Sequence, residues 1–208
     1  MQRSHDRLIF LHGFLGSPED WDGVISFLPE FHCEALTYPF QIPPDGILIG
    51  YSMGGRRALR YPHPKIVLSA HPGLKTPAEK SVRRLHDQKW LDLLHRISLE
   101  EFIKAWYQQS LFKSLKLDEA LLKRRLNQNR EVIARMLTQE SLANQSFSTD
   151  ATFLYGELDT KFAEIYKSHQ ISAIELKGVG HACHLENPKV VAESIKLILL
   201  NALSKITQ

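Results

Sequence analysis

Cysteine is scarce in this chain. Its 208 residues include only two, Cys33 and Cys183, which are too few for the disulfide framework of a small secreted domain. They also lack the Cys-x-x-Cys spacing that is typical of redox and zinc sites. We therefore expect two reduced thiols that hold no metal.

Long apolar runs are missing as well. No segment approaches the roughly 18 consecutive apolar residues that span a bilayer, and the polar segment Met1–Arg7 is followed by only four apolar residues. The sequence thus predicts neither a membrane helix nor a secretory signal. We expect a cytoplasmic protein with no membrane partner.

Basic runs that alternate with stacking aromatic residues are also absent. Residues 73–147 hold 14 Lys and Arg against 9 Asp and Glu, whereas the rest of the chain holds 12 against 14. The absence of such runs disfavours a nucleic-acid partner. The basic middle third instead favours a basic lid that covers a small anionic substrate.

The segment Ile47–Ala58 carries the main chemical signal. It reads Ile-Leu-Ile-Gly-Tyr-Ser-Met-Gly-Gly-Arg-Arg-Ala, which predicts a strand, a sharp turn and a helix, the elements of a nucleophile elbow. Ser52 stands at the apex, and Gly50 and Gly54 let strand and helix approach each other. A chance Gly-x-Ser-x-Gly in a loop is the alternative, but the flanking patterns argue against it.

Apolar runs predict a sheet interrupted by a helical insertion. We expect strands at residues 8–11, 31–36, 46–50, 65–70, 151–155 and 172–176, and helices near 79–94, 98–109, 118–127 and 129–142. The predicted fold class is α/β, namely an α/β-hydrolase fold with a reduced, mostly parallel sheet of about six strands. Residues 1–72 and 148–208 form the core, and residues 73–147 form an all-helical lid inserted before the last two strands.

One connection is too short for this fold. Prolines at 39, 43 and 44 exclude a helix between Thr37 and Asp45, where parallel strands normally need a crossover helix. The apolar sheet surface must then be covered by a partner subunit, a shifted lid or larger side chains. A homodimer through this face is one hypothesis.

A catalytic triad follows from the order of residues along the chain. Ser52, Asp159 and His181 occur in the order Ser, Asp, His that α/β-hydrolases use. His184 is a rival base, but His181 directly follows Gly180 after the last strand. A zinc pair of His181 and His184 lacks a companion ligand at suitable spacing. Asp159 would orient the imidazole, and His181 would take the proton of Ser52.

An oxyanion site is predicted beside the triad. The turn His12-Gly13-Phe14 follows the first strand, where such hydrolases place one backbone donor. We expect the N–H groups of Phe14 and Met53 to be the two donors. His12 could act as a base, but we interpret it as structural, because His181 is better placed.

Further motifs indicate one family within the α/β-hydrolase fold. Beyond the elbow, the chain contains His71-Pro72-Gly73-Leu74, Asp87 with Trp90, Trp106-Tyr107-Gln108-Gln109, and Arg125 with Asn127 and Asn129. In these motifs, from about Leu8 to the C-terminal helix, the chain resembles the MenH family, the 2-succinyl-6-hydroxy-2,4-cyclohexadiene-1-carboxylate synthases of menaquinone biosynthesis. The resemblance implies elimination of pyruvate from 2-succinyl-5-enolpyruvyl-6-hydroxy-3-cyclohexene-1-carboxylate, without metal or organic cofactor.

The resemblance also implies a set of substrate-binding residues. The substrate carries three carboxylates, which suit planar, permanently charged donors. The matching positions here are Arg56, Arg83, Arg125, Tyr51 and Trp106. Lid arginines are commonly solvated surface charges, as we expect for Arg84 and Arg124, and Trp106 could instead belong to the lid core.

Two other functions remain open at this point. A carboxylesterase or thioesterase of the biotin-pathway type would share the triad and the fold, but it would not need three buried guanidinium groups. A non-catalytic scaffold would not need an intact triad.

Overall fold

A six-stranded parallel sheet forms the centre of the molecule. The computed structural model describes residues 7–206, so Met1–Asp6 of the polar N-terminal segment lie outside the described residues. The strands are β1 (Arg7–Leu11), β2 (His32–Leu36), β3 (Ile47–Tyr51), β4 (Lys65–Leu68), β5 (Thr152–Gly156) and β6 (Ala173–Leu176). Their order is β2-β1-β3-β4-β5-β6, and every adjacent pair is parallel. The predicted fold class is confirmed.

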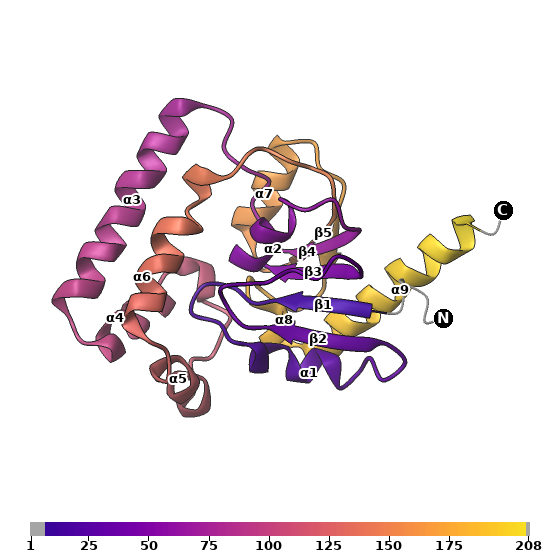
Figure 1. The fold of residues 1–208 in the computed structure, drawn as a ribbon, viewed down its shortest axis with the longest axis horizontal. Coiled ribbons are helices and arrows are strands. Elements are labelled where there is room, and N and C mark those ends of the chain that lie inside the picture. The colour runs from indigo at the N-terminus through magenta and orange to yellow at the C-terminus, as the bar shows by residue number, and fades with distance from the viewer. Residues whose placement is uncertain (1–6, 207–208) are drawn as a thin grey trace.

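Alternation along β1 divides the core into two layers. Leu8 and Phe10 face one side and Ile9 and Leu11 the other, as the two-residue repeat of a strand requires. The first side is covered by the 3-10 helix η2 (Pro18–Trp21), α1 (Asp22–Ile25), α8 (Cys183–Glu186) and α9 (Pro188–Ile206), and the second by α2 (Met53–Ala58) and α7 (Thr160–Ser168). Figure 1 shows the sheet between these two groups of helices. Nearly all residues of the inner strands β1, β3 and β4 are therefore buried on both faces, whereas the edge strands β2 and β6 are more exposed.

The connection between β2 and β3 contains no helix, as its prolines predict. Tyr38 and Phe40 from this connection are buried and pack with Ile9 and Leu11 of the sheet, in a cluster that also contains Met136 of the lid. Larger side chains and the lid thus cover the surface that a crossover helix would otherwise cover. A partner subunit is not needed for that purpose.

Four α-helices follow β4 before the sheet resumes at β5. They are α3 (Pro77–Arg96), α4 (Leu99–Tyr107), α5 (Glu119–Leu126) and α6 (Arg130–Gln139), with short 3-10 helices at Ser110–Phe112 (η3) and Leu142–Asn144 (η4). Figure 1 shows them gathered at one end of the sheet. Their apolar residues Leu94, Phe102 and Ile133 form a separate cluster with Leu15, which lies in the loop after β1. The loop that follows the first strand is therefore attached to the helical insertion.

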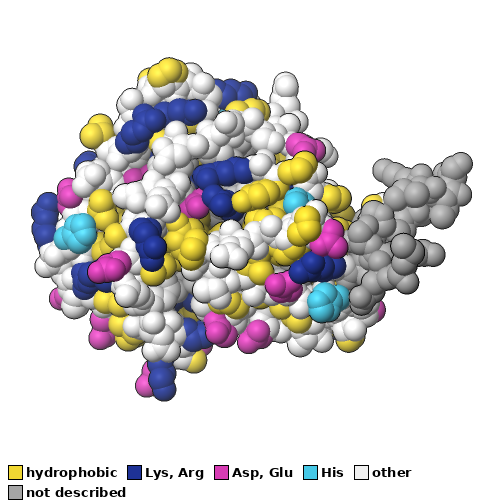
Figure 2. All heavy atoms as spheres, in the orientation of Figure 1, with side chains coloured by type: hydrophobic (Ala, Val, Ile, Leu, Met, Phe, Trp, Pro, Cys, Tyr) yellow, Lys and Arg dark blue, Asp and Glu magenta, His cyan; other side chains and the backbone are white. Residues whose placement is uncertain are grey.

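Charged and apolar side chains are mixed on the surface of the molecule (Figure 2). On the face drawn in Figure 2, Lys and Arg side chains of the described residues are scattered among acidic and apolar side chains and form no continuous stripe. Within residues 7–206, no helix has both the length and the apolar character needed to cross a membrane.

Candidate active site

Ser52 lies at the sharp turn between β3 and α2. Its backbone has φ 47° and ψ −106°, a conformation that is uncommon for a residue with a side chain. A Cβ atom on Gly54 would collide with the backbone carbonyl of Leu11, and one on Gly50 would collide with the backbone of Gly55. Both glycines are thus required for the close approach of strand and helix, as the elbow motif predicts.

Asp159 and His181 meet at the ends of the last two strands. Asp159 follows β5 and caps α7, where Oδ1 accepts a hydrogen bond from the backbone N–H of Phe162 (3.2 Å). Its Oδ2 lies 2.7 Å from His181 Nδ1, and both side chains are almost fully buried. When Nδ1 donates to this carboxylate, Nε2 is left as the basic nitrogen of the neutral ring.

Aromatic rings hold the imidazole of His181 in place. The rings of Phe162, Tyr51 and Phe112 have centroids 5.1, 5.3 and 5.5 Å from that of His181. The rival His184 lies elsewhere, between Trp21 and Tyr51, with centroid distances of 4.7 and 4.2 Å. Burial lowers the pKa of His184 to about 3, and the Asp159 carboxylate pairs with His181 instead.

A cavity of about 140 Å³ opens beside Ser52. Its wall includes two predicted catalytic side chains, Ser52 and His181, and the two residues whose amides we expect to bind an oxyanion, Phe14 and Met53. The remaining residues of the wall come largely from the elbow helix, the lid and α7: Arg56, His71, Arg83, His86, Asp87, Trp106, Gln109, Leu111, Met136, Leu137, Glu140, Ser141, Leu142, Lys161 and Phe162. Core and lid therefore share the cavity.

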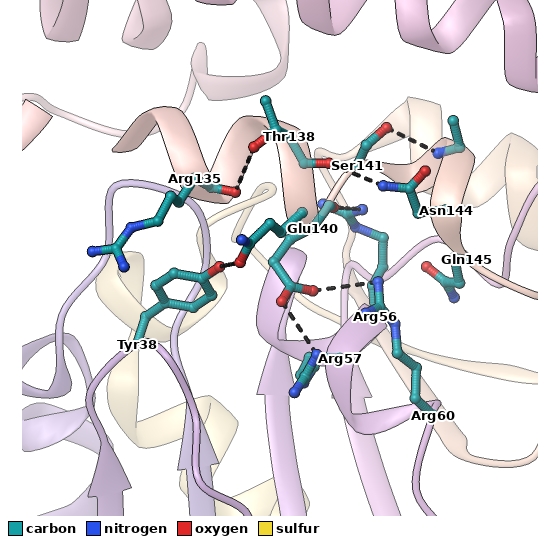
Figure 3. A network of polar contacts seen from close by, with 12 residues as sticks. Tyr38, Arg56, Arg57, Arg60, Arg135, Thr138, Glu140, Ser141, Asn144 and Gln145 are labelled. Carbon is teal, nitrogen blue, oxygen red and sulfur yellow. Dashed lines mark hydrogen bonds and ion pairs between the residues drawn. The ribbon is translucent and has the colours of Figure 1, made fainter. Parts of the chain in front are cut away.

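Arg56 reaches the cavity from α2 and is held by the lid. Its guanidinium donates to the backbone carbonyl of Glu140 (2.6 Å), just after α6. The Glu140 carboxylate in turn lies 3.3 Å from both Arg57 and Arg60 (Figure 3). Burial, and then the nearby charge of Arg83, lower the pKa of Arg56 to about 9. Arg56 is thus a partly desolvated cation that remains charged at neutral pH.

Arg83 contributes a second cation from α3. Its Nε donates to Asp87 Oδ1 (2.7 Å), and Asp87 Oδ2 accepts a hydrogen bond from the Ser141 hydroxyl (2.6 Å). The side chain is about 29% exposed and lines the cavity, whereas its neighbour Arg84 is exposed and does not. This placement agrees with the expectation that Arg83 faces the site and Arg84 faces solvent.

Arg125 does not lie where the resemblance implied. Its side chain is only 2% exposed, and it forms an ion pair with Asp20 (2.9 Å) and donates to the Tyr107 hydroxyl (2.8 Å). Although burial opposes the charge, Tyr107 and Asp20 raise the pKa of Arg125. The cavity wall does not include it. The expected substrate contact is therefore corrected to a buried structural ion pair.

The two predicted aromatic residues differ in position. Tyr51 is 6% exposed and packs behind the triad, against His181 and His184, so it does not line the cavity as expected. Trp106 does line it, and its ring packs on Phe14 and Trp90 at centroid distances of 4.4 and 4.8 Å. Trp106 thus belongs to the cavity wall and to the packing of the lid at once.

His12 has the structural position that we expected. It is 1% exposed, its Nδ1 lies 2.8 Å from the carbonyl oxygen of Gly13, and its ring packs edge-on against Phe40. Burial lowers the pKa of His12 to about 4, so the ring is neutral at neutral pH.

Several cavity residues were not predicted as site residues. His71 and Gln109 stand inside motifs that the sequence analysis quotes, and Lys161 follows Asp159 by two residues, so a signal in the sequence was available for each. Glu140 acts on Arg56 through its backbone carbonyl. No side-chain pattern could have indicated that contact.

Across residues 7–206, no three His, Cys, Asp or Glu side chains are grouped so that they could hold a metal ion.

Comparison with known proteins places these features in a class. A model of the alpha/beta hydrolase family matches residues 11–194, and the chain belongs to that family. Within it, the chain groups with the 2-succinyl-6-hydroxy-2,4-cyclohexadiene-1-carboxylate synthases. The Enterobacter sp. (strain 638) synthase is 31% identical over 92% of this chain and 91% of its own length. A Haemophilus influenzae protein provisionally assigned the same name is 33% identical over 93% of this chain and 97% of its own length.

Solved structures show the same fold. MenH from S. aureus superposes with a TM-score of 0.81 at 23% identity, covering 100% of this chain and 96% of that one. A thermophilic esterase from Thermogutta terrifontis has a TM-score of 0.66 at 16% identity, covering 94% of this chain and 89% of that one. The fold is thus shared by synthases and esterases, and it does not distinguish their activities.

Proposed function

We propose that this protein is a 2-succinyl-6-hydroxy-2,4-cyclohexadiene-1-carboxylate synthase of menaquinone biosynthesis, which eliminates pyruvate from 2-succinyl-5-enolpyruvyl-6-hydroxy-3-cyclohexene-1-carboxylate. The observation that carries the proposal is the identity of 31–33% with such synthases over more than nine-tenths of the chain. The cavity supports it, because Arg56 and Arg83 share its wall with Ser52. The substrate has a carboxylate in its succinyl, enolpyruvyl and ring substituents, so cations are needed where it binds.

The proposed chemistry begins with proton abstraction. Ser52, deprotonated by His181, removes the hydrogen from ring carbon 2, which is acidic because it lies beside the succinyl ketone. The electron pair forms the 2,3 double bond, the 3,4 double bond moves to 4,5, and the carbon–oxygen bond at carbon 5 breaks. The product is the 2,4-diene, and the leaving enolpyruvate becomes pyruvate on protonation.

Two backbone amides would stabilise the charge that develops during this step. As the proton leaves, negative charge accumulates on the ketone oxygen, and we propose that the N–H groups of Phe14 and Met53 bind it. Both residues line the cavity beside Ser52. Asp159 would keep the imidazole of His181 oriented and stabilise its cationic form.

The helical insertion completes the site in this proposal. Residues 73–147 act as a lid on a core of residues 1–72 and 148–208, because Arg83 and Trp106 of the insertion line the same cavity as Ser52. The partner we propose is the small tricarboxylate substrate. A homodimer remains a prediction for light scattering, but the need to cover the sheet no longer supports it, since Tyr38 and Phe40 already do so.

One assay separates this function from an ester hydrolase. Purified protein is given the enolpyruvyl substrate and, separately, a neutral p-nitrophenyl ester, and the release of pyruvate and of nitrophenolate is followed. We expect pyruvate release to have the far larger kcat/KM. Rapid ester cleavage without pyruvate release would instead make the protein a carboxylesterase or thioesterase.

A further inference from the structure

His71 is a cavity residue to which the proposed chemistry assigns no role. It follows β4 and lines the same cavity as Ser52 and Arg56. Its Nδ1 accepts a hydrogen bond from the backbone N–H of Gly73 (3.1 Å). A neutral imidazole has one donor and one acceptor nitrogen, so this bond leaves the ring proton on Nε2.

The turn that fixes this tautomer is built into the backbone. Gly73 has φ 126°, a conformation that favours glycine, and a Cβ there would lie 2.6 Å from the Cα atom of Phe147. The Gln145 side-chain amide donates to the carbonyl oxygen of His71 (3.2 Å). The position of the ring therefore does not depend on a bound ligand.

The surroundings keep the imidazole neutral. Burial comes first and the charge of Arg56 second among the causes that lower the pKa of His71 to about 4, and His169, Arg83 and Lys161 act in the same direction. Among the residues whose side chains the structure describes, none forms a hydrogen bond with its Nε2; the bonds of His71 are those of Nδ1 and of the carbonyl oxygen. At neutral pH the Nε2–H group of His71 is therefore a hydrogen-bond donor in the cavity wall that is available to a ligand.

A neutral donor suits this part of the cavity. Arg83 lies near enough to Arg56 to lower its pKa, and the bond that Arg56 makes is to a carbonyl rather than a carboxylate. A third full cation beside them would add repulsion before the substrate arrives. A neutral N–H adds a directed hydrogen bond without that penalty.

We infer that His71 is a substrate-binding residue whose Nε2–H donates to a carboxylate oxygen of the substrate held by Arg56 and Arg83. This inference rests on the proposed function, and it adds a specificity-determining group to it. The arginines supply charge, and His71 fixes the direction from which the carboxylate is bound.

Two substitutions separate this role from the role of the turn. In His71→Asn, the side-chain oxygen can accept from Gly73 in place of Nδ1, but nothing replaces Nε2–H. In His71→Gln, the longer amide can supply an N–H near the position of Nε2. We expect His71→Asn to lower kcat/KM for pyruvate release by about 10-fold or more, mainly through KM, and His71→Gln to recover much of the loss.

Controls distinguish a local effect from unfolding. His95 is an exposed histidine of α3 outside the cavity wall, and His95→Asn should leave KM and the melting temperature unchanged. His71→Asn should lower turnover of a neutral p-nitrophenyl ester far less than pyruvate release. Equal losses on both substrates, or a drop in melting temperature that matches the loss of turnover, would show that His71 only supports the turn.

Binding of citrate, a simple tricarboxylate, tests His71 without catalysis. If the wild-type protein releases no pyruvate, the proposed function fails, and the stabilisation of each variant by citrate then decides the inference alone. We expect His71→Asn to bind citrate about 10-fold more weakly than the wild type. Equal affinities would overturn the inference.

The pH dependence provides a readout that a structural role would not affect. Because the ring is neutral, the ratio of wild-type to His71→Asn kcat/KM should stay constant from about pH 6 to about pH 8. The other groups that act on His71, namely Arg56, Arg83, Lys161 and His169, are present in both proteins, so the ratio isolates the effect of residue 71. A ratio that shrinks as pH rises would identify a cationic imidazole and would contradict the inference.

Discussion

The proposed catalytic half of the site and its cationic half are built in different ways. Ser52, Asp159 and His181 each follow a strand of one parallel sheet, so the common edge of that sheet brings them together. The cations depend on contacts between core and lid, as where Arg56 meets the carbonyl of Glu140, 84 residues away. The first arrangement is set by topology and local backbone geometry, and the second by pairing across the chain.

Substitution of Ser52 should have the largest effect on the catalytic half. We expect Ser52→Ala to lower kcat for pyruvate release by at least about 10³-fold, because the proton-abstracting group is lost. Ser52→Gly should be equally inactive, yet about 1 kcal/mol more stable than Ser52→Ala, since glycine tolerates φ 47°. Steady-state kinetics and urea unfolding measure the two effects. Turnover within tenfold of the wild type would remove Ser52 from the mechanism.

Arg125 tests the opposite end of the comparison, where a cation has a structural role. Arg125→Met should lower the free energy of unfolding by about 3 kcal/mol, because the buried carboxylate of Asp20 loses the nearer of its two arginine partners. Adding Asp20→Leu should restore part of that loss. Urea unfolding measures both, and Lys123→Met, at an exposed position of the same helix, is the control, because Arg124 itself lies 3.8 Å from Asp20. A raised KM with unchanged stability would return Arg125 to the substrate site.

Arg83 tests the cationic half directly. Arg83→Ala should lower kcat/KM for pyruvate release by about 10- to 100-fold, through loss of a charge-assisted hydrogen bond, and should affect a neutral ester far less. Arg84→Ala is the matched control, since that side chain is exposed on the same helix and does not line the cavity. Parallel losses on both substrates would assign Arg83 to the structure of the lid.

What the sequence could predict follows the same division. The strands, the helix-free connection after β2 and the elbow all depend on nearby residues, and the chain order of Ser, Asp and His is typical of one fold. These predictions of fold were confirmed. Asp159 lies 2.7 Å from His181, and Ser52 and His181 line one cavity, whereas the triad as a catalytic unit stays a prediction.

The remaining features depend on contacts that a sequence does not display. Arg125 matched a family motif, but its partner Asp20 lies 105 residues away, and nothing in the local pattern indicates the pair. Tyr51 precedes Ser52 directly, yet alternation along β3 turns its side chain into the core. A motif thus identifies a position in the chain, and packing decides which way the side chain faces.

His184 provides the smallest expected effect, and it concerns the side of the catalytic half that faces away from the cavity. Burial lowers its pKa to about 3, from an ordinary value of 6.5. Between these values the unfolded chain binds a proton that the folded chain does not, so the free energy of unfolding falls as pH decreases from about 6.5. Each such histidine contributes a slope of at most about 1.4 kcal/mol per pH unit. His12 and His71, with pKa values of about 4, act in the same direction.

Replacement of His184 isolates its share of this slope. His184→Phe fills the space between Trp21 and Tyr51 with a ring that cannot bind a proton. We expect acid destabilisation between about pH 6 and about pH 4 to become shallower by roughly 1 kcal/mol per pH unit, as measured by urea unfolding at several pH values. The exposed His95→Phe should leave the slope unchanged. If His184→Phe also leaves the slope unchanged, the buried imidazole does not stay neutral on acidification. Protons and water would then reach the space between Trp21 and Tyr51.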